Sequence, residues 1–167
     1  MSARPLVSKI FILLTSLSIV GCSSQSNSLY DQKSANAIKA KHWLSLNAKR
    51  EGVMQTESGL QYRILKKTDG CYPDDGYKVK VHYKMVSVQS KSVVDSSYDR
   101  GQPSEFKLSK TIKGWREGVP MMRVGEVWEL YIPSDLGYGS KGLGRDVPPN
   151  SVLVSQVHLV SARRCES

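Results

Sequence analysis

The stretch Lys110-Thr-Ile-Lys-Gly-Trp-Arg-Glu-Gly-Val-Pro-Met-Met122 decides the fold. Within it, Trp115, Val119 and Met122 stand at i, i+4 and i+7, the spacing of one helix face. A helix this short, interrupted by Pro120, is marginal alone and needs packing against other elements. Trp115 begins the pattern, and it is either an ordinary core aromatic or a side chain that can be reached from the mouth of a surrounding sheet.

The segments around this helix have the patterns of β-strands. Residues 77–85 alternate most clearly, with Tyr and Val pointing one way and Lys and His the other, as in a half-buried antiparallel strand. Further strands are predicted at residues 60–66, 128–132 and 152–160, and a helix is predicted from Lys33 to Glu51. We therefore expect an α+β domain in which a curved antiparallel sheet wraps around one short helix.

The N-terminus has the pattern of an export signal. Arg4 and Lys9 precede the apolar run 10–20, which is shorter than the roughly 20 residues that span a bilayer. Ile19-Val-Gly-Cys22 resembles the bacterial lipobox, in which the cysteine is acylated and becomes the first residue after cleavage. A plain secretory signal or a retained membrane anchor are the alternatives.

This interpretation divides the chain into three parts. Residues 1–21 are expected to be a lipoprotein signal peptide, residues 22–57 a tether and N-terminal helix, and residues 58–165 the folded domain. The tether is placed at Ser23 to about Gln32, where Ser, Asn and Gln are frequent. Loss of residues 1–21 removes two basic residues and lowers the net charge from +9 to +7.

Charge and cysteine content limit the possible functions. The basic residues form no cluster interleaved with aromatic residues, so no nucleic-acid partner is expected. The three His have no partners at metal-ligand spacing, so neither a metal nor a cofactor is expected. If Cys22 carries lipid, Cys71 and Cys165 remain, an even number that favours a disulfide in an oxidising compartment. Two free thiols are the alternative.

One motif favours a different chemistry. Gly137-Tyr-Gly-Ser-Lys-Gly142 satisfies the letters G-x-G-x-x-G and follows a predicted strand. A dinucleotide site also needs a helix to begin at this loop, so that its N-terminus holds the pyrophosphate. The chain instead continues into Val147-Pro-Pro-Asn150, which does not start a helix promptly. We interpret the segment as a flexible loop over a pocket.

Four segments in one order resemble a known family. They are Val81-His-Tyr83; Asp95-Ser-Ser-Tyr-Asp-Arg-Gly-Gln-Pro103; Ile112-Lys-Gly-Trp-Arg-Glu-Gly118; and Ile132-Pro-Ser-Asp-Leu-Gly-Tyr-Gly139 with Val147-Pro-Pro149. Together they resemble the FKBP-type peptidyl-prolyl cis-trans isomerases. The lead-in Ser58-Gly-Leu-Gln-Tyr62 is similar to the exported bacterial branch that includes the macrophage infectivity potentiator group. The resemblance covers about Ser58 to Ala162.

The resemblance implies a five-stranded antiparallel half-barrel around the short helix, with an apolar pocket for a proline ring. Trp115 would form its floor, Asp95 would lie beside the rotating bond, and the Tyr138 hydroxyl and Ile112 N–H would hold substrate carbonyls. With Tyr83, these are the expected catalytic residues. Further pocket residues are expected at Val94, Arg100, Phe106, Thr111, Val147 and Ser155. The same fold would bring Cys165 within reach of Cys71.

Several positions depart from the family pattern. Residues that are usually aromatic in active members are Val94, Ser104 and Ser155 here, and the residue that often closes the pocket is Leu143 or Gly144. Ser155 is expected to face the pocket and to make it wider and wetter, and a gain of activity in Ser155→Phe would confirm where the pocket lies. Asp95 and Arg100 are alternatively a plain ion pair that fixes a loop.

The expected function is therefore a peptidyl-prolyl isomerase of modest activity that assists the folding of exported proteins. Its partners would be proline-containing clients, with macrolides as further ligands of altered affinity. A lipid on Cys22 would anchor it in the cell envelope, at the outer membrane facing the periplasm because Ser23 follows. The alternatives are a lipid-anchored chaperone or binding module without turnover, and a purely structural envelope lipoprotein. The sequence does not indicate the oligomeric state.

Overall fold

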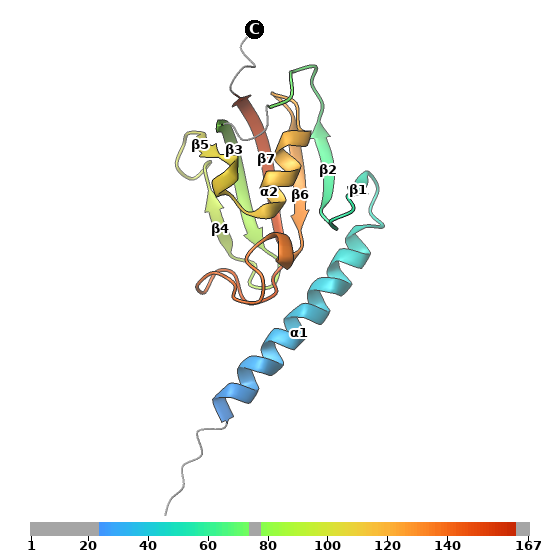
Figure 1. Cartoon of the computed structure of the whole chain (residues 1–167), viewed down its shortest axis with the longest axis vertical. Helices are drawn as coiled ribbons and strands as arrows, with labels where there is room; N and C mark the ends of the chain where they lie inside the picture. The colour runs from blue at the N-terminus through green and yellow to red at the C-terminus, as the bar shows by residue number, and fades with distance from the viewer. Residues whose placement is uncertain (1–23, 74–77, 163–167) are drawn as a thin grey trace, which may run out of the picture.

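A computed structural model describes residues 24–73 and 78–162 of the chain (Figure 1). The elements in order are α1 (Ser24–Asn47), β1 (Val53–Gln55), β2 (Gln61–Lys66), β3 (Lys78–Ser87), β4 (Val93–Ser96), β5 (Ser104–Lys107), η1 (Leu108–Lys110), α2 (Lys113–Gly118), η2 (Val119–Met121), β6 (Val127–Ile132), η3 (Ser134–Leu136) and β7 (Leu153–Ala162). The four strands expected from the alternation correspond to β2, β3, β6 and β7.

The sheet is antiparallel, with the strand order β1-β2-β6-β7-β3-β4 and with β5 also paired to β3. It therefore has seven strands in the described residues, where five were expected. The difference has a simple origin. β4 pairs with the far end of β3 and β5 with its beginning, so the two short strands share one edge and are separated by residues 97–103. β1 adds a further short strand outside β2.

The short helix α2 packs against the concave side of this sheet (Figure 1). The prediction of which helix face is buried is confirmed, because Trp115, Val119 and Met122 are all buried. The residue before Trp115 has to be small, since a Cβ on Gly114 would lie 2.6 Å from Cγ2 of Ile132. The glycine thus lets the helix approach β6 closely and sets the depth at which the indole lies. Removing apolar surface from water at this interface is what holds so short a helix in place.

The long helix α1 extends away from the sheet and contacts it mainly near its C-terminal half (Figure 1). It begins at Ser24, so most of the stretch expected to be a tether is helical, and it ends at Asn47, before the expected Glu51. Near that end Asn47 donates to the Gln61 side chain at 2.9 Å, and Gln61 donates to the Leu44 carbonyl at 3.0 Å. None of the described helices combines the length and the apolar character that crossing a membrane requires.

A second set of polar contacts joins α1 to the loop between β6 and β7. The Asn36 amide donates to the Pro149 carbonyl, and the Asn150 amide donates to the Lys33 carbonyl, both at 3.0 Å. The Asn150 N–H in turn donates to the Gly139 carbonyl at 3.0 Å. The loop is held on another side as well, because Ser90 donates to the Asp146 carbonyl at 2.6 Å. These contacts fix the backbone next to Tyr138.

Candidate active site

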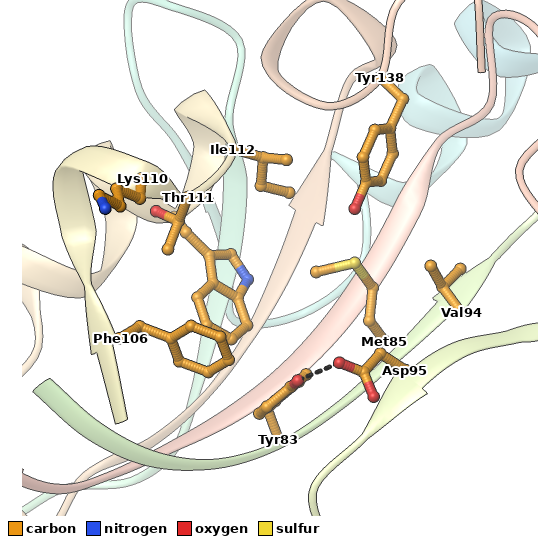
Figure 2. Close-up of a pocket in the computed structure, with 10 residues that line it drawn as sticks. Tyr83, Met85, Val94, Asp95, Phe106, Lys110, Thr111, Ile112 and Tyr138 are labelled. Atoms are coloured by element: carbon orange, nitrogen blue, oxygen red, sulfur yellow. Dashed lines mark hydrogen bonds between the residues drawn. The ribbon is translucent and has the colours of Figure 1, made fainter. Parts of the chain in front are cut away.

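A cavity of about 330 Å³ opens between α2, β3, β4, β5 and the loop after β6 (Figure 2). Its wall is predominantly apolar, and much of it is aromatic. It is lined by Tyr83, Met85, Val94, Asp95, Phe106, Lys110, Thr111, Ile112, Trp115 and Tyr138. A space of this size at the open end of a sheet is large enough for a small apolar ring with its flanking peptide.

Three aromatic rings from three elements form the base of the cavity. The Trp115 indole of α2 makes edge-to-face contacts with Tyr83 of β3 and Phe106 of β5, at centroid distances of 4.9 and 5.4 Å. Tyr83 and Phe106 also meet edge to face, at 5.5 Å. Such pairs contribute roughly 0.5–1.5 kcal/mol each beyond the buried area, so the three rings hold one another in place. Although Trp115 is only 3% exposed, it is a lining residue, and the cavity opens onto it.

A polar network lies at the rim. The Tyr83 hydroxyl donates to one Asp95 carboxylate oxygen, and Arg100 forms an ion pair with the other (Figure 2 shows the Tyr83 bond). Arg100 also donates to the Tyr83 hydroxyl at 3.0 Å and to Ser104 at 3.1 Å. The serine that replaces an expected aromatic residue thus helps to hold the guanidinium. Arg100 is in this network, but it is not itself a lining residue of the cavity.

The network changes the proton affinities of its members. Burial, with the hydrogen bond to Asp95, raises the pKa of Tyr83 to about 12, so its hydroxyl keeps its proton at neutral pH. Burial alone would raise the pKa of Asp95, but hydrogen bonds from Tyr83, Arg100 and the Ser96 N–H outweigh it and lower the pKa. Asp95 is therefore a carboxylate at neutral pH. Its charge lies at the edge of an apolar cavity.

Two residues that carry unused hydrogen-bond donors line the cavity. The Tyr138 hydroxyl points towards its centre from the loop after β6, and Ile112 precedes the first turn of α2 (Figure 2). In the part of the chain that the structure describes, neither the Tyr138 hydroxyl nor the Ile112 N–H bonds to a protein acceptor. Both donors are thus available to carbonyl groups of a bound peptide.

The structure brings most of the expected site residues together, but besides Arg100 two more of the expected pocket residues do not line the cavity. Val147 and Ser155 are almost fully buried and do not line the cavity. Ser155 is 0% exposed, and its hydroxyl accepts a hydrogen bond from the Trp115 indole N–H at 3.2 Å. The expectation that Ser155 makes the pocket wetter is therefore wrong, because the hydroxyl is used to hold the floor. The exposed Leu143 does not line the cavity either.

Two lining residues were missed by the sequence interpretation, Met85 and Lys110. The alternation of residues 77–85 puts Met85 on the same face as Tyr83, and this parity could have identified it. No comparable signal marks Lys110, which lies at the end of η1.

The remaining expectations concern metals, nucleotides and cysteines. Among residues 24–73 and 78–162, no three His, Cys, Asp or Glu side chains are grouped as a metal site. The glycine-rich motif begins no helix, and Leu143 instead forms an isolated antiparallel bridge with Val147. Cys22 and Cys165 lie outside the described residues, so lipidation and the pairing with Cys71 stay predictions.

A wrapped sheet and an apolar cavity with an indole floor have the size and chemistry that suit a small apolar ring. Comparisons with known proteins agree. Residues 70–160 match the family model "FKBP-type peptidyl-prolyl cis-trans isomerase", and residues 21–64 match "Domain amino terminal to FKBP-type peptidyl-prolyl isomerase". The chain belongs to the FKBP-type peptidyl-prolyl cis-trans isomerase family.

Individual relatives of this chain are bacterial members of the family. The chain is 44% identical over 126 residues to the FKBP-type 22 kDa isomerase of Escherichia coli, covering 75% of this chain and 61% of that protein. It is 38% identical to the isomerase Mip of Coxiella burnetii, covering 77% and 56%. The crystal structure of FkpA from Escherichia coli superposes with a TM-score of 0.75 at 34% identity, covering 81% and 63%. The chain thus spans about half to three fifths of these relatives.

Proposed function

We propose that this chain is a peptidyl-prolyl cis-trans isomerase that acts on proline-containing segments of other polypeptides. The observation that carries the proposal is the apolar cavity on the Trp115 floor, with the Tyr138 hydroxyl and Ile112 N–H facing it as unused donors. A proline ring fits such a floor because it is small and apolar and has no N–H to satisfy. The two donors would fix the carbonyls on either side of it.

The cavity suits a rotation in which no covalent bond is broken. Turning an X–Pro bond crosses a barrier of about 20 kcal/mol because amide resonance is lost. The planar amide is more polar than the twisted one, so an apolar wall disfavours the planar form relative to the transition state. Each 1.4 kcal/mol or so of this difference gives about a tenfold rate increase. Asp95 would interact with the rotating carbonyl, and its lowered pKa keeps it charged at neutral pH.

The proposal is tested by isomerisation of a proline tetrapeptide, with cis and trans forms distinguished by a trans-specific protease. Wild-type protein should accelerate the exchange over the uncatalysed reaction. Trp115→Ala should remove the acceleration, whereas Trp43→Ala, which changes an indole on α1, should retain it. A wild-type rate equal to the uncatalysed one, with client aggregation still suppressed, would instead identify a binding module or chaperone.

We further propose that the protein is anchored in the bacterial envelope by a lipid on Cys22. The relatives support the envelope, since Mip of Legionella longbeachae is named an outer membrane protein. α1 begins two residues after Cys22 and is about 36 Å long, and the part of it that precedes the contacts at Lys33 and Asn36 would space the domain from the lipid. Mass spectrometry of the N-terminal peptide tests this. A diacylated peptide beginning at residue 22 is expected, and it should be absent in Cys22→Ser.

A disulfide between Cys71 and Cys165 is proposed as a link between two ends of the domain. The Val124 N–H donates to the Cys71 carbonyl at 2.9 Å, and the adjacent Gly125 N–H donates to the Leu159 carbonyl at 2.7 Å. The loop containing Cys71 thus lies close to the C-terminal part of β7, near Leu159. Non-reducing digestion should give one peptide containing both cysteines, and separate alkylated peptides would contradict the pairing.

Macrolides are proposed as ligands of the same cavity. The family includes a protein of Dictyostelium discoideum named FK506-binding protein 1, which is 44% identical over 105 residues. Val94 stands where an aromatic wall was expected, so fewer ring contacts are available to a large ligand. We expect weaker binding than in members with that ring, measured by calorimetric titration, with Val94→Phe binding more tightly.

A further inference from the structure

The two faces of the sheet carry different kinds of side chain. The concave face holds α2 and the apolar cavity, and its residues belong to the core. Burial alternates along β3, so that Lys78, Lys80 and Lys84 project from the other, convex face and are exposed. The convex face therefore presents a row of ammonium groups on the same strand that supplies Tyr83 to the cavity.

Neighbouring strands add two more lysines to this side of the sheet. Residues directly opposite one another in an antiparallel pair lie on the same face. Lys107 on β5 is opposite Lys78. Lys66 on β2 pairs with Val127 on β6, and Val127 precedes Trp128, which points into the core. The five exposed lysines of the convex side are named the basic face: Lys66, Lys78, Lys80, Lys84 and Lys107.

Little negative charge balances the basic face. In the strands that the structure describes, only Glu105 and Glu129 add carboxylates to the convex side. Glu105 forms an ion pair with Lys78 at 2.7 Å, and Glu129 forms one with Arg63 at 2.9 Å. Among residues 24–73 and 78–162, the other lysines of the basic face have no ion-pair partner. The face thus keeps a net positive charge.

One pair within the basic face is unfavourable by itself. Lys78 and Lys107 are direct cross-strand partners, and like charges at such positions destabilise a sheet. Glu105 contacts Lys78 and leaves Lys107 without a carboxylate in the described part of the chain. A negatively charged surface laid against β3 and β5 would relieve this repulsion.

The helix α1 does not cover β3 and β5. It contacts the other half of the sheet, where Trp43 packs on Tyr131 of β6 and Asn47 donates to Gln61 of β2. In the order of the strands, β7 lies between that half and β3. Most of α1 extends past the edge of the sheet (Figure 1). The lysines of β3 and β5 are consequently open to a partner.

We propose that the basic face is a docking surface for an anionic phospholipid bilayer. A lysine close to a membrane that contains anionic lipid increases partitioning onto it by about fivefold, and the attraction fades beyond a Debye length of about 10 Å at 0.1 M salt. Five lysines on one face add these effects. With the basic face against the bilayer, the cavity on the concave side points away from the lipid and stays open to polypeptides. The inference goes beyond the proposed function, because it depends neither on turnover nor on a lipid at Cys22.

The test is co-sedimentation with vesicles, using the chain from residue 22 onward with Cys22→Ser so that no attached lipid contributes. The vesicles contain phosphatidylcholine alone or phosphatidylcholine mixed with phosphatidylglycerol. The protein should bind the mixed vesicles and leave the neutral ones free. Binding should disappear at about 1 M salt, where the Debye length is about 3 Å.

Two double variants with the same change in net charge locate the surface. Lys84→Glu with Lys107→Glu should lower the partition coefficient at least about tenfold. This variant creates no like-charge pair across strands, because residue 107 is opposite Lys78 and residue 84 is opposite a serine and a glutamine. Lys113→Glu with Arg116→Glu, at exposed positions of α2, is the matched control and should stay within about threefold of wild type.

Each outcome supports or overturns the docking surface. Equal binding to neutral and mixed vesicles, or binding to neither, overturns it. Equal weakening in both double variants shows that net charge alone matters and overturns the assignment to the basic face. Binding to soluble polyglutamate but not to vesicles points to an acidic polypeptide instead of a membrane. If the first variant does not fold, Lys84→Gln with Lys107→Gln replaces it and should weaken binding at least about fivefold. None of these results bears on isomerisation, so the proposed function stands or falls separately.

Discussion

The cavity and the long helix α1 are held in place by different forces. The cavity rests on the buried rings of Tyr83 and Trp115, the partly buried ring of Phe106, and the apolar cluster beneath them. α1 is joined to the domain by side-chain amides and by one ring contact, between Trp43 and Tyr131 at 5.9 Å, and its Tyr30 and Ile38 are 73% and 71% exposed. A net contribution of about 0.5–1.5 kcal/mol per hydrogen bond is small beside the burial of an indole. The helix can therefore be loosened without unfolding the sheet, whereas the floor of the cavity cannot.

The largest effect is expected when one tryptophan from each region is replaced by alanine. Trp115→Ala should lower the free energy of unfolding by about 3–5 kcal/mol, because it opens a void in the core, and should reduce isomerisation at least a hundredfold. Trp43→Ala should cost about 1 kcal/mol and leave isomerisation within twofold. Urea unfolding and the peptide assay measure the two quantities. Equal losses of stability and activity in both variants would show that the helix and the cavity unfold as one cooperative unit.

A smaller loss is expected when a ring is placed beneath the indole. Ser155→Phe should cost about 1–3 kcal/mol because Ser155 is fully buried and the indole N–H loses its acceptor. Activity should fall with it, whereas a gain would have been the sign that residue 155 faces the pocket. Adding Met85→Ala should recover part of the stability, since it frees the space opposite. An active, stable single variant would mean that the indole is not held by Ser155.

Loosening α1 should have a more local effect. Asn36→Ala removes the hydrogen bond to the Pro149 carbonyl and should destabilise the loop of Tyr138 by about 1 kcal/mol without changing global unfolding. Amide hydrogen exchange should become faster in residues 139–151 and stay the same in β3 and β7. Ile38→Ala, at an exposed position of the same helix, is the control. Faster exchange throughout the sheet would contradict the separation of the two regions.

The smallest effect concerns pH. The pKa of Asp95 is lower in the folded protein than its ordinary value of about 3.9. Its contribution to stability is thus fully present above that value and is lost as the pH falls through the folded pKa. The midpoint of thermal unfolding should fall more steeply between pH 4 and pH 2 in wild type than in Asp95→Asn. Asp99→Asn, in the turn that follows β4, should behave as wild type does.

The sequence predicted the parts of the fold that depend on local periodicity. The i, i+4, i+7 spacing of Trp115, Val119 and Met122 located the helix and its buried face, and alternation located the strands. The start of α1 was missed because Ser, Asn and Gln suggest a tether, yet each costs only a few tenths of a kcal/mol in a helix. The pairing of β4 and β5 with one edge of β3 depends on tertiary geometry that no local pattern contains.

The site was predictable to a similar extent. Motif order identified the residues around Trp115, and the structure brings Tyr83, Asp95, Ile112 and Tyr138 to the same cavity. The role of Ser155 was misjudged. Alternation along the strand shows correctly that its side chain points inward, but its hydrogen-bond partner, the Trp115 indole N–H, can be identified only when α2 is placed on the sheet. Met85 is two residues from Tyr83 and therefore lies on the same face of the strand. It was overlooked because the family pattern directed attention to other positions.

The attachment of the loop after β6 determines how a polypeptide can reach the cavity. Asn36 on α1 donates to the Pro149 carbonyl, and in the turn after β3 Ser90 donates to the Asp146 carbonyl while Gln89 accepts from the Val152 N–H. The loop is therefore fastened from two separate parts of the chain, and these bonds restrict its movement as a rigid flap over the cavity. If the chain acts as proposed, such an entrance would favour prolines in extended, accessible segments over those in compact turns.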